Sequence, residues 1–261
     1  MYLDPFSIYH HAIQQLPPDS NMQIPNIKKL TFMLCLSLIS LAPIPQVLAA
    51  DNDLDELTVQ LGNEWRIVKD DTRRGIKAYA KLENDKRFRS FKVEATLNTS
   101  LDVIGRVLFD FNSYFKWYWQ IKDIQLLKKV SETEHYLYIA HNAPPTIPDR
   151  DVILHTIIEP YSAKHPYVTF RVKAMPNYIP PKPPLIRMLA EDMLLKMTPI
   201  GNKVKLEAEG YVDPNGKEPV WATNFIQRSA PYSIIKGLQY MTTLEQYQKP
   251  DDNPQFVLRV N

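Results

Sequence analysis

Apolar and polar residues alternate along many short runs of the chain, which is the pattern of β-strands with one buried face. In residues 88–97, for example, Phe91, Val93 and Ala95 fall on one face, and charged or hydroxyl residues fall on the other. The same reasoning predicts strands over residues 65–69, 76–82, 88–97, 121–129, 135–141, 150–159, 167–175 and 204–212. Residues 185–197 fit either a strand or a short helix.

Three other segments carry apolar residues at helical spacings of three and four. These predicted helices cover residues 53–62, 99–111 and 219–246. Asp53 caps the first helix, and Thr99 with Ser100 starts the second. Pro231 must kink or split the third, because a proline ring inside a helix removes a hydrogen bond and clashes with the preceding turn.

The order of these elements predicts an α+β fold. Short links join successive strands, which favours an antiparallel sheet. The Asp-Pro-Asn-Gly turn at residues 213–216 then leads into the last helix. No repeat or low-complexity linker interrupts residues 51–261, so we expect one domain whose strands wrap around the C-terminal helix.

The N-terminal part of the chain has the features of an export signal. Residues 1–21 are polar and rich in proline, and we interpret them as a non-structural extension, with translation starting at Met22. Residues 22–50 then combine two lysines, a short apolar run and small residues, as a cleavable signal peptide does. We therefore expect secretion across the inner membrane into the periplasm. The alternative is an uncleaved anchor, although the run is shorter than the ~20 residues of a membrane helix.

Composition excludes several classes of function. The chain has 261 residues, is 44% hydrophobic and carries a formal net charge of +2. Its basic residues are scattered among acids, which argues against binding nucleic acid but leaves a transient contact with a membrane surface open. Cys35 is the only cysteine, so no disulfide or thiolate metal site can form within the chain. We expect no metal and no cofactor.

Candidate chemistry is sparse. The chain has no Gly-x-Ser-x-Gly turn, no His-Glu-x-x-His helix and no glycine-rich nucleotide loop. A pair of His141 with Glu134 or Asp149 is the remaining acid–base candidate. The aromatic passage at residues 109–119 is either a hydrophobic plug at one end of the core or the wall of an apolar ligand site. We favour the plug.

Three passages, taken in this order and spacing, resemble the START domain, the lipid-transfer family of the helix-grip (Bet v-like) superfamily. They are Val-Leu-Phe-Asp at residues 107–110 with Trp117, Pro-Asp-Arg-Asp-Val at residues 148–152, and the turn at 213–216 followed by Pro219, Trp221 and Asn224. The resemblance covers roughly residues 60–248. It implies a helix-grip fold, in which a curved antiparallel sheet grips the C-terminal helix around an internal hydrophobic cavity.

The resemblance also implies a function: a non-catalytic monomer that binds, and shuttles, one lipid-like molecule. The alternatives are a cavity enzyme of the same superfamily, of cyclase or hydrolase type, and an envelope interaction protein. The candidate lining residues are Trp117, Tyr136, Tyr138, Thr156, Trp221, Phe225 and Tyr232, with His155 and Arg228 as polar contacts. For each of them the alternative is ordinary core packing.

The resemblance also implies a lid, formed by the loop before Arg150 and the C-terminal helix, with Pro148, Arg150 and Asp151 as its motif. Arg150 and Asp151 either contact a head group or clamp the loop, and we favour the clamp. Sterol carriers of the family tend to place an acid and an arginine inside the cavity. Thr156 and tyrosines stand near those positions here, so the resemblance does not carry sterol specificity over.

Overall fold

The computed structural model describes residues 63–145, 147–217 and 220–249, apart from the side chains of residues 220–225 and 227. All of them belong to Asp51–Asn261, the second of the two units into which the chain divides. The predicted extension, signal peptide and first helix lie outside the described residues and stay predictions.

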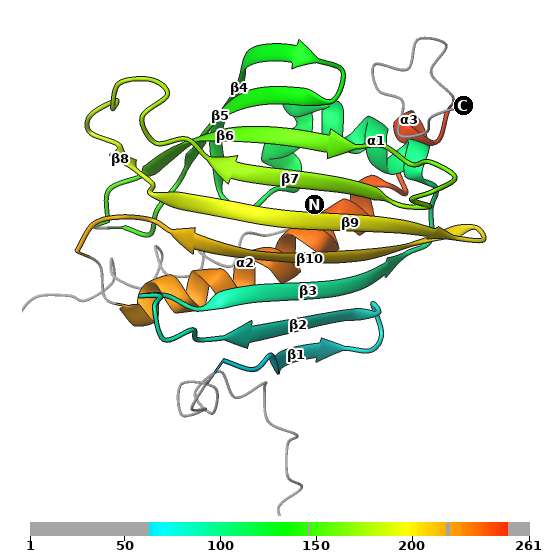
Figure 1. Ribbon diagram of the computed structural model, residues 1–261, viewed down its shortest axis with the longest axis horizontal. Coiled ribbons are helices and arrows are strands. Elements are labelled where there is room, and N and C mark those ends of the chain that lie inside the picture. Colours follow the sequence, from blue (N-terminus) through cyan, green and yellow to red (C-terminus); the bar gives the residue numbers. More distant parts are fainter. Residues whose placement is uncertain (1–62, 146, 218–219, 250–261) are drawn as a thin grey trace, which may run out of the picture. The chain divides into compact units, whose positions relative to one another are not determined.

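One curved antiparallel sheet dominates the described residues (Figure 1). Its strands are β1 (Arg66–Asp71), β2 (Ile76–Lys81), β3 (Ser90–Leu97), β4 (Ile121–Ser131), β5 (Glu134–His141), β6 (Arg150–Glu159), β7 (Val168–Ala174), β8 (Ile186–Arg187), β9 (Ala190–Ile200) and β10 (Lys203–Asp213). They lie in the order β1-β2-β3-β10-β9-β7-β6-β5-β4, and β8 pairs in parallel with β6. Every predicted strand is confirmed, and residues 185–197 form β8 and most of β9.

The helices are α1 (Leu101–Phe109), the 3-10 helix η2 (Phe111–Lys116), α2 (Val220–Met241) and α3 (Glu245–Gln248). Ser100 caps α1 as predicted, because its hydroxyl accepts a hydrogen bond from the backbone N–H of Val103 at 3.4 Å. The helix ends at Phe109 rather than Phe111, where the tighter η2 begins after Asp110. No helix among the described residues is long and apolar enough to cross a membrane.

The C-terminal helix corrects one prediction. The sequence predicted that Pro231 kinks or splits this helix. α2 continues through Pro231 as a single helix, so it is not split there. The helix continues beyond Pro231 because Ile235, Leu238 and Met241 are buried against the core, and their burial outweighs one lost backbone hydrogen bond. α2 ends at Met241, and the residues predicted to extend it form a turn and the separate α3.

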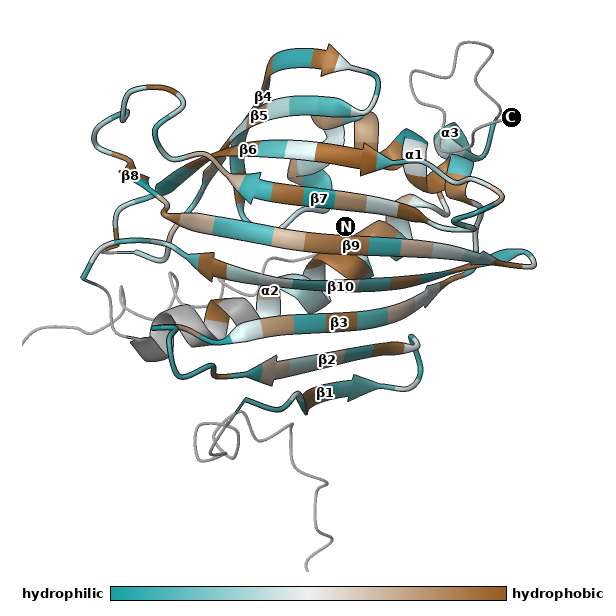
Figure 2. Ribbon diagram, in the orientation of Figure 1, coloured by the Kyte–Doolittle hydropathy of each residue, from teal (hydrophilic) through white to brown (hydrophobic). Residues whose placement is uncertain are grey.

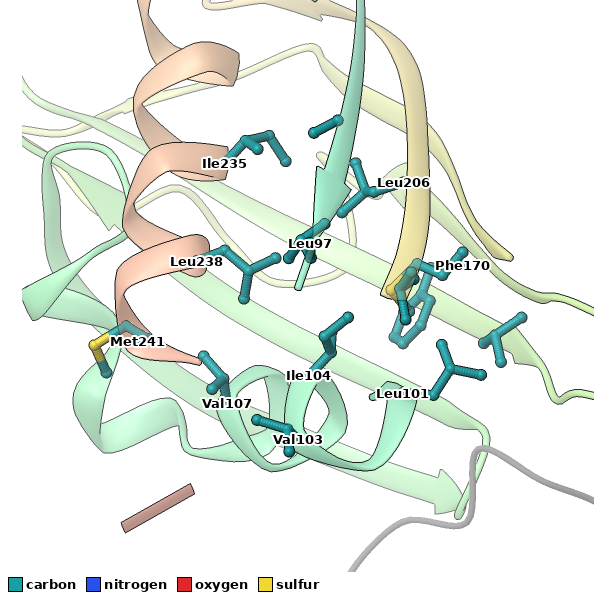
Figure 3. Close-up of a cluster of buried hydrophobic side chains, with 14 of the residues drawn as sticks. Leu97, Leu101, Val103, Ile104, Val107, Phe170, Leu206, Ile235, Leu238 and Met241 are labelled. Carbon is teal, nitrogen blue, oxygen red and sulfur yellow. The ribbon is translucent and has the colours of Figure 1, made fainter. Parts of the chain in front are cut away.

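The helices α1 and α2 pack on one face of the sheet, where the main core lies. Figure 3 shows α2 side chains meeting residues of α1, such as Ile104, and strand residues such as Leu97 and Leu206. The alternation of hydrophilic and hydrophobic residues along β3 is visible in Figure 2. At Gly237 an added Cβ would lie 2.5 Å from the Trp117 carbonyl oxygen, so this close approach of α2 to the segment after η2 requires glycine.

Candidate functional site

A cavity of about 310 Å³ lies between the sheet and the helices. Its apolar lining comprises Phe91, Val93, Leu108, Phe109, Phe111, Tyr114, Trp117, Tyr118, Trp119, Leu137, Ile139, Ala143, Pro144, Ile147, Leu154, Ile158, Phe170, Val172, Met188, Met193, Leu195, Leu206, Ala208, Val212, Pro214, Ile226, Ala230, Pro231, Ile234, Ile235 and Leu238. Few polar side chains reach it. A concave, mostly apolar site with a small number of polar groups is the usual form of a small-molecule binding site.

The period of the strands decides which residues reach the cavity. On β5 the lining residues include Leu137 and Ile139, and on β6 they include Leu154 and Thr156. Successive side chains of a strand point to opposite faces of the sheet, so the residues between them point away from the cavity. The same alternation places Met193 of β9 among the lining residues.

Two of the predicted contact residues lie in the wall of the cavity. Trp117, after η2, is buried, and its ring centroid lies 4.9 Å from that of Tyr114. Thr156 lines the cavity from β6. The aromatic passage at residues 109–119 contributes several further rings to this wall. The preference for a plain hydrophobic plug is therefore wrong, because the same rings that close the core also border an open volume.

Tyr136, Tyr138 and His155 do not line the cavity, which corrects the prediction for them. They belong to the opposite side of β5 and β6, because each alternates with a residue that faces the cavity. The Tyr136 ring stacks on the His155 ring at 4.5 Å and on the Tyr178 ring at 4.5 Å. The Lys182 ammonium lies 3.7 Å from the centroid of the Tyr138 ring. Predicting both His155 and Thr156 as lining residues could not succeed, since neighbours on a strand point to opposite faces.

Arg228 and Tyr232 of α2 also lie away from the cavity, so their prediction as cavity contacts is wrong. Arg228 donates a hydrogen bond to the Val68 carbonyl at 3.4 Å, and Tyr232 donates its hydroxyl proton to Asp71 at 2.7 Å. Both side chains therefore attach α2 to β1 and its end. The lining residues of α2 occupy a different side of the helix, because 3.6 residues make one turn.

Trp221 and Phe225 belong to α2 by their backbone, but their side chains are outside what the structure describes. Their predicted contact with a ligand therefore stays a prediction.

Arg150 acts as a clamp at the end of the cavity. Its guanidinium donates to the carbonyl of Pro148, to that of Pro214 at 3.3 Å and to that of Asn215 at 3.4 Å. These bonds join the loop before β6 to the turn after β10. Asp149 in the same loop accepts a hydrogen bond from the backbone N–H of Ala143 at 2.9 Å, which fixes the fold of the loop. Arg150 also lines the cavity, so the clamp and a ligand contact are compatible.

Asp151 has no part in the cavity wall. It is fully buried and pairs with Arg187 through two bonds of 2.9 Å. Arg187 also donates to the carbonyls of Pro176 and Ile179 at 2.8 and 2.9 Å. The pair therefore fastens the proline-rich loop after β7 to the sheet, and the structural interpretation of Asp151 agrees with these contacts.

Tyr118, His141 and Glu191 form a polar corner of the cavity. The sequence did not predict that these three residues lie together. His141 Nε2 lies 3.6 Å from Glu191 Oε2, and the His141 Nδ1 lies 3.3 Å from the Trp119 carbonyl oxygen. Burial lowers the pKa of His141, but the Glu191 carboxylate and the Trp119 carbonyl outweigh it, so the pKa is raised. Burial and the charge of Glu191 raise the pKa of Tyr118 well above its ordinary value.

The acid beside His141 is thus neither of the two that the sequence suggested. Glu134 pairs with His155 at 2.8 Å, and Asp149 pairs with Lys122 at 2.6 Å. The only signal for Glu191 was an acidic pair, Glu191 and Asp192, within the apolar run at residues 185–197, which the sequence left unassigned between helix and strand. As a strand, that run puts Glu191 on the same face as Met193 and Leu195, inside the cavity.

The described residues contain no group of three or more His, Cys, Asp or Glu side chains arranged to hold a metal ion.

Comparison with known proteins places the fold. No protein-family model and no curated protein sequence matches the chain. Among solved structures, a STAR-related lipid transfer protein fragment from Xanthomonas axonopodis is 27% identical, with a TM-score of 0.63 over 69% of this chain and 99% of that one. Human STARD10 is 17% identical, with a TM-score of 0.60 over 77% and 82% of the two chains. Human StAR-related lipid transfer protein 5 is 15% identical, with a TM-score of 0.56 over 75% and 92%.

These likenesses confirm the resemblance to START domains and the helix-grip α+β fold.

Proposed function

We propose that this START-fold chain binds one hydrophobic, lipid-like molecule in the cavity between its sheet and α2. The observation that carries the proposal is the cavity itself: about 310 Å³, bordered mostly by aliphatic and aromatic side chains. Ligand sites commonly occupy ~300–1,000 Å³. The solved structures that share the fold include proteins named for lipid transfer, which supports the same class of ligand.

Hydrophobic transfer supplies enough free energy for such a function without a catalyst. Each methylene removed from water contributes ~0.8 kcal/mol. A chain of ~16 carbons therefore offers on the order of 13 kcal/mol before the costs of ordering and association are subtracted. Water gains little in the cavity, because an apolar wall offers it few hydrogen bonds. A ligand that replaces water there is favoured by its apolar area alone.

Release of the ligand requires part of the wall to move, and we propose the loop at residues 142–149. Its residues Ala143, Pro144 and Ile147 border the cavity, and Arg150 holds it to the turn after β10 through backbone carbonyls. Hydrogen bonds to carbonyls can re-form after opening, so the clamp permits a reversible lid. Shuttling between membranes, with brief contact at their surfaces, follows from such a lid. We place this activity in the periplasm, on the basis of the predicted signal peptide at residues 22–50.

Native mass spectrometry with lipid extraction of the purified protein tests the proposal. Ala208→Phe fills the cavity from β10, while Glu209→Phe adds the same ring at the next, exposed position of the strand. We expect the wild type and the Glu209 variant to carry one bound lipid, and the Ala208 variant to lose it at an unchanged thermal midpoint. Equal lipid content in both variants, or a wild type that binds none of a panel of added lipids, would contradict the proposal.

A further inference from the structure

The polar corner joins residues that are distant in the sheet. His141 is the last residue of β5, and Glu191 is near the start of β9, with β6 and β7 between them in the strand order. Both side chains reach across the cavity side of the sheet and approach one another there. Tyr118 follows η2, and its ring centroid lies 6.4 Å from that of His141. Three elements of the fold, β5, β9 and the segment after η2, therefore position this polar corner of the cavity wall.

The hydrogen bonds of this corner are incomplete. A carbonyl oxygen only accepts, so His141 Nδ1 carries the proton in its contact with Trp119. The opposite ring nitrogen, Nε2, faces Glu191 Oε2 at 3.6 Å, which is too long for a hydrogen bond. Within the described residues, neither of these two buried atoms has a hydrogen-bond partner. Glu191 is only 5% exposed, so solvent at the surface does not satisfy it either.

The charge state of the pair defines what fits between the two atoms. With the pKa of His141 raised, the imidazolium form presents an N–H donor at Nε2. The Glu191 carboxylate beside it presents an acceptor at Oε2. The pair is then neutral as a whole, and it offers one donor and one acceptor side by side in an apolar cavity.

The distance between the two atoms and their donor and acceptor roles favour a hydroxyl group as the ligand between them. An oxygen at ~2.8 Å from each atom fits between them, because 3.6 Å is less than twice that length. A hydroxyl accepts from Nε2–H through a lone pair and donates its own proton to Oε2. A carboxylate has no proton to give to Glu191, and an ether or ester has none either. A quaternary ammonium group has neither an N–H to donate nor a lone pair to accept.

We propose that His141 and Glu191 form a subsite that holds the hydroxyl group of a neutral lipid whose apolar body fills the cavity. The proposal rests on the function proposed above and specifies the chemical class of its ligand. The subsite lies at the other end of β5 and β6 from Thr156, the position to which the family resemblance drew attention, because His141 pairs with Arg150 whereas Thr156 pairs with His135. Tyr118 borders the same corner, so its phenol is a further group within the polar part of the cavity.

Three probes that share a hexadecyl chain test the subsite: hexadecanol, hexadecyl methyl ether and hexadecanoate. Affinities come from displacement of a fluorescent fatty probe by each compound, delivered from cyclodextrin. We expect wild type to bind the alcohol roughly tenfold more tightly than the ether, as one retained hydrogen-bond pair predicts. In the double variant His141→Phe with Glu191→Leu, this preference falls below twofold while the ether binds as before.

A matched control uses the other histidine–glutamate pair of the sheet. Glu134→Leu removes the partner of His155, which lies away from the cavity, and it leaves the preference for the alcohol unchanged. Equal binding of alcohol and ether by wild type overturns the subsite but leaves the proposed function standing, and it indicates that water fills the gap. Tighter binding of hexadecanoate than of hexadecanol would show that the subsite prefers an anion, and it would also overturn the hydroxyl subsite. Binding of no probe overturns both proposals.

Discussion

Two histidine–glutamate pairs occupy the two sides of the same sheet, and they differ in how completely they are satisfied. On the side away from the cavity, His155 Nε2 and Glu134 Oε1 lie 2.8 Å apart, and the Tyr136 ring stacks on the imidazole at 4.5 Å. Inside the cavity, His141 and Glu191 lie 3.6 Å apart, with both facing atoms buried and unbonded within the described residues. The outer pair is joined by a direct hydrogen bond, whereas the facing atoms of the inner pair are too far apart for one.

A third pair, Asp151 with Arg187, is a buried ion pair in which both groups are hydrogen-bonded. Asp151 and Arg187 are joined by two bonds of 2.9 Å, and the guanidinium uses further donors on the carbonyls of Pro176 and Ile179. The loop after β7 thus depends on this pair. At the inner pair, His141 Nε2 and Glu191 Oε2 have no such partners within the described residues. An unpaired buried polar atom costs free energy, so this arrangement does not serve stability alone.

The largest predicted effect on stability comes from breaking the Asp151–Arg187 pair. Asp151→Ala leaves the Arg187 guanidinium buried without its carboxylate, and we expect the free energy of unfolding to fall by about 3–5 kcal/mol. Urea denaturation measures the change. Glu159→Ala is the control, because its pair with Arg171 is more than half exposed, and we expect a loss below about 1 kcal/mol there. Similar losses for the two variants would mean that the buried pair is no more important than a surface pair.

The second prediction concerns the inner pair. His141→Phe alone leaves the buried Glu191 carboxylate without its cation, and we expect a loss of about 1–3 kcal/mol. Adding Glu191→Leu removes the orphaned charge and fills the corner with apolar atoms. Replacing a buried ion pair in this way is often neutral or stabilising by about 1–4 kcal/mol. We therefore expect the double variant to be at least as stable as wild type by urea denaturation.

A double variant clearly less stable than wild type would contradict this expectation. It would mean that the inner pair stabilises the fold as the Asp151–Arg187 pair does. The two pairs would then not differ in their contribution to stability.

Most of the fold follows from local sequence patterns, because strands and caps are local features. Alternation along residues 88–97 and the cap at Ser100 are properties of neighbouring residues, and both appear in the structure. Residues 185–197 remained open, since apolar runs of that kind fit a strand or a helix equally. The course of α2 through Pro231 depended on tertiary packing, which a local rule does not include.

The site was predicted less well, and the reason is register. Thr156 and Trp117 reach the cavity, but Tyr136, Tyr138 and His155 were placed on the wrong side of strands that were themselves correct. A shift of one residue along a strand exchanges its two faces, and nothing local in β5 or β6 fixes which face is concave. Glu191 was missed because its partner comes from a strand that is not its neighbour in the sheet.

The third prediction concerns the pKa of His141 in the inner pair. The pKa of His141 is raised above 6.5, so its protonated form is favoured in the folded protein. The resulting stabilisation is fully present below pH 6.5 and is lost as the pH rises through the folded-state pKa. Histidine ring signals in NMR spectra should show a midpoint above 6.5 for His141, and Glu191→Gln should lower it. An unchanged midpoint in that variant would show that Glu191 does not govern the imidazole.

The smallest effect belongs to the outer pair. In Glu134→Gln the hydrogen bond to His155 becomes a neutral one, and the Glu134 side chain is already 35% exposed. Partly exposed ion pairs contribute little, so we expect a loss below about 1 kcal/mol in urea denaturation. Lipid content by native mass spectrometry should equal that of wild type, because the pair lies on the side of the sheet away from the cavity. If this variant lost its lipid while remaining folded, the outer pair would influence the cavity through the sheet, and satisfaction of hydrogen bonds would no longer distinguish a structural pair from a binding one.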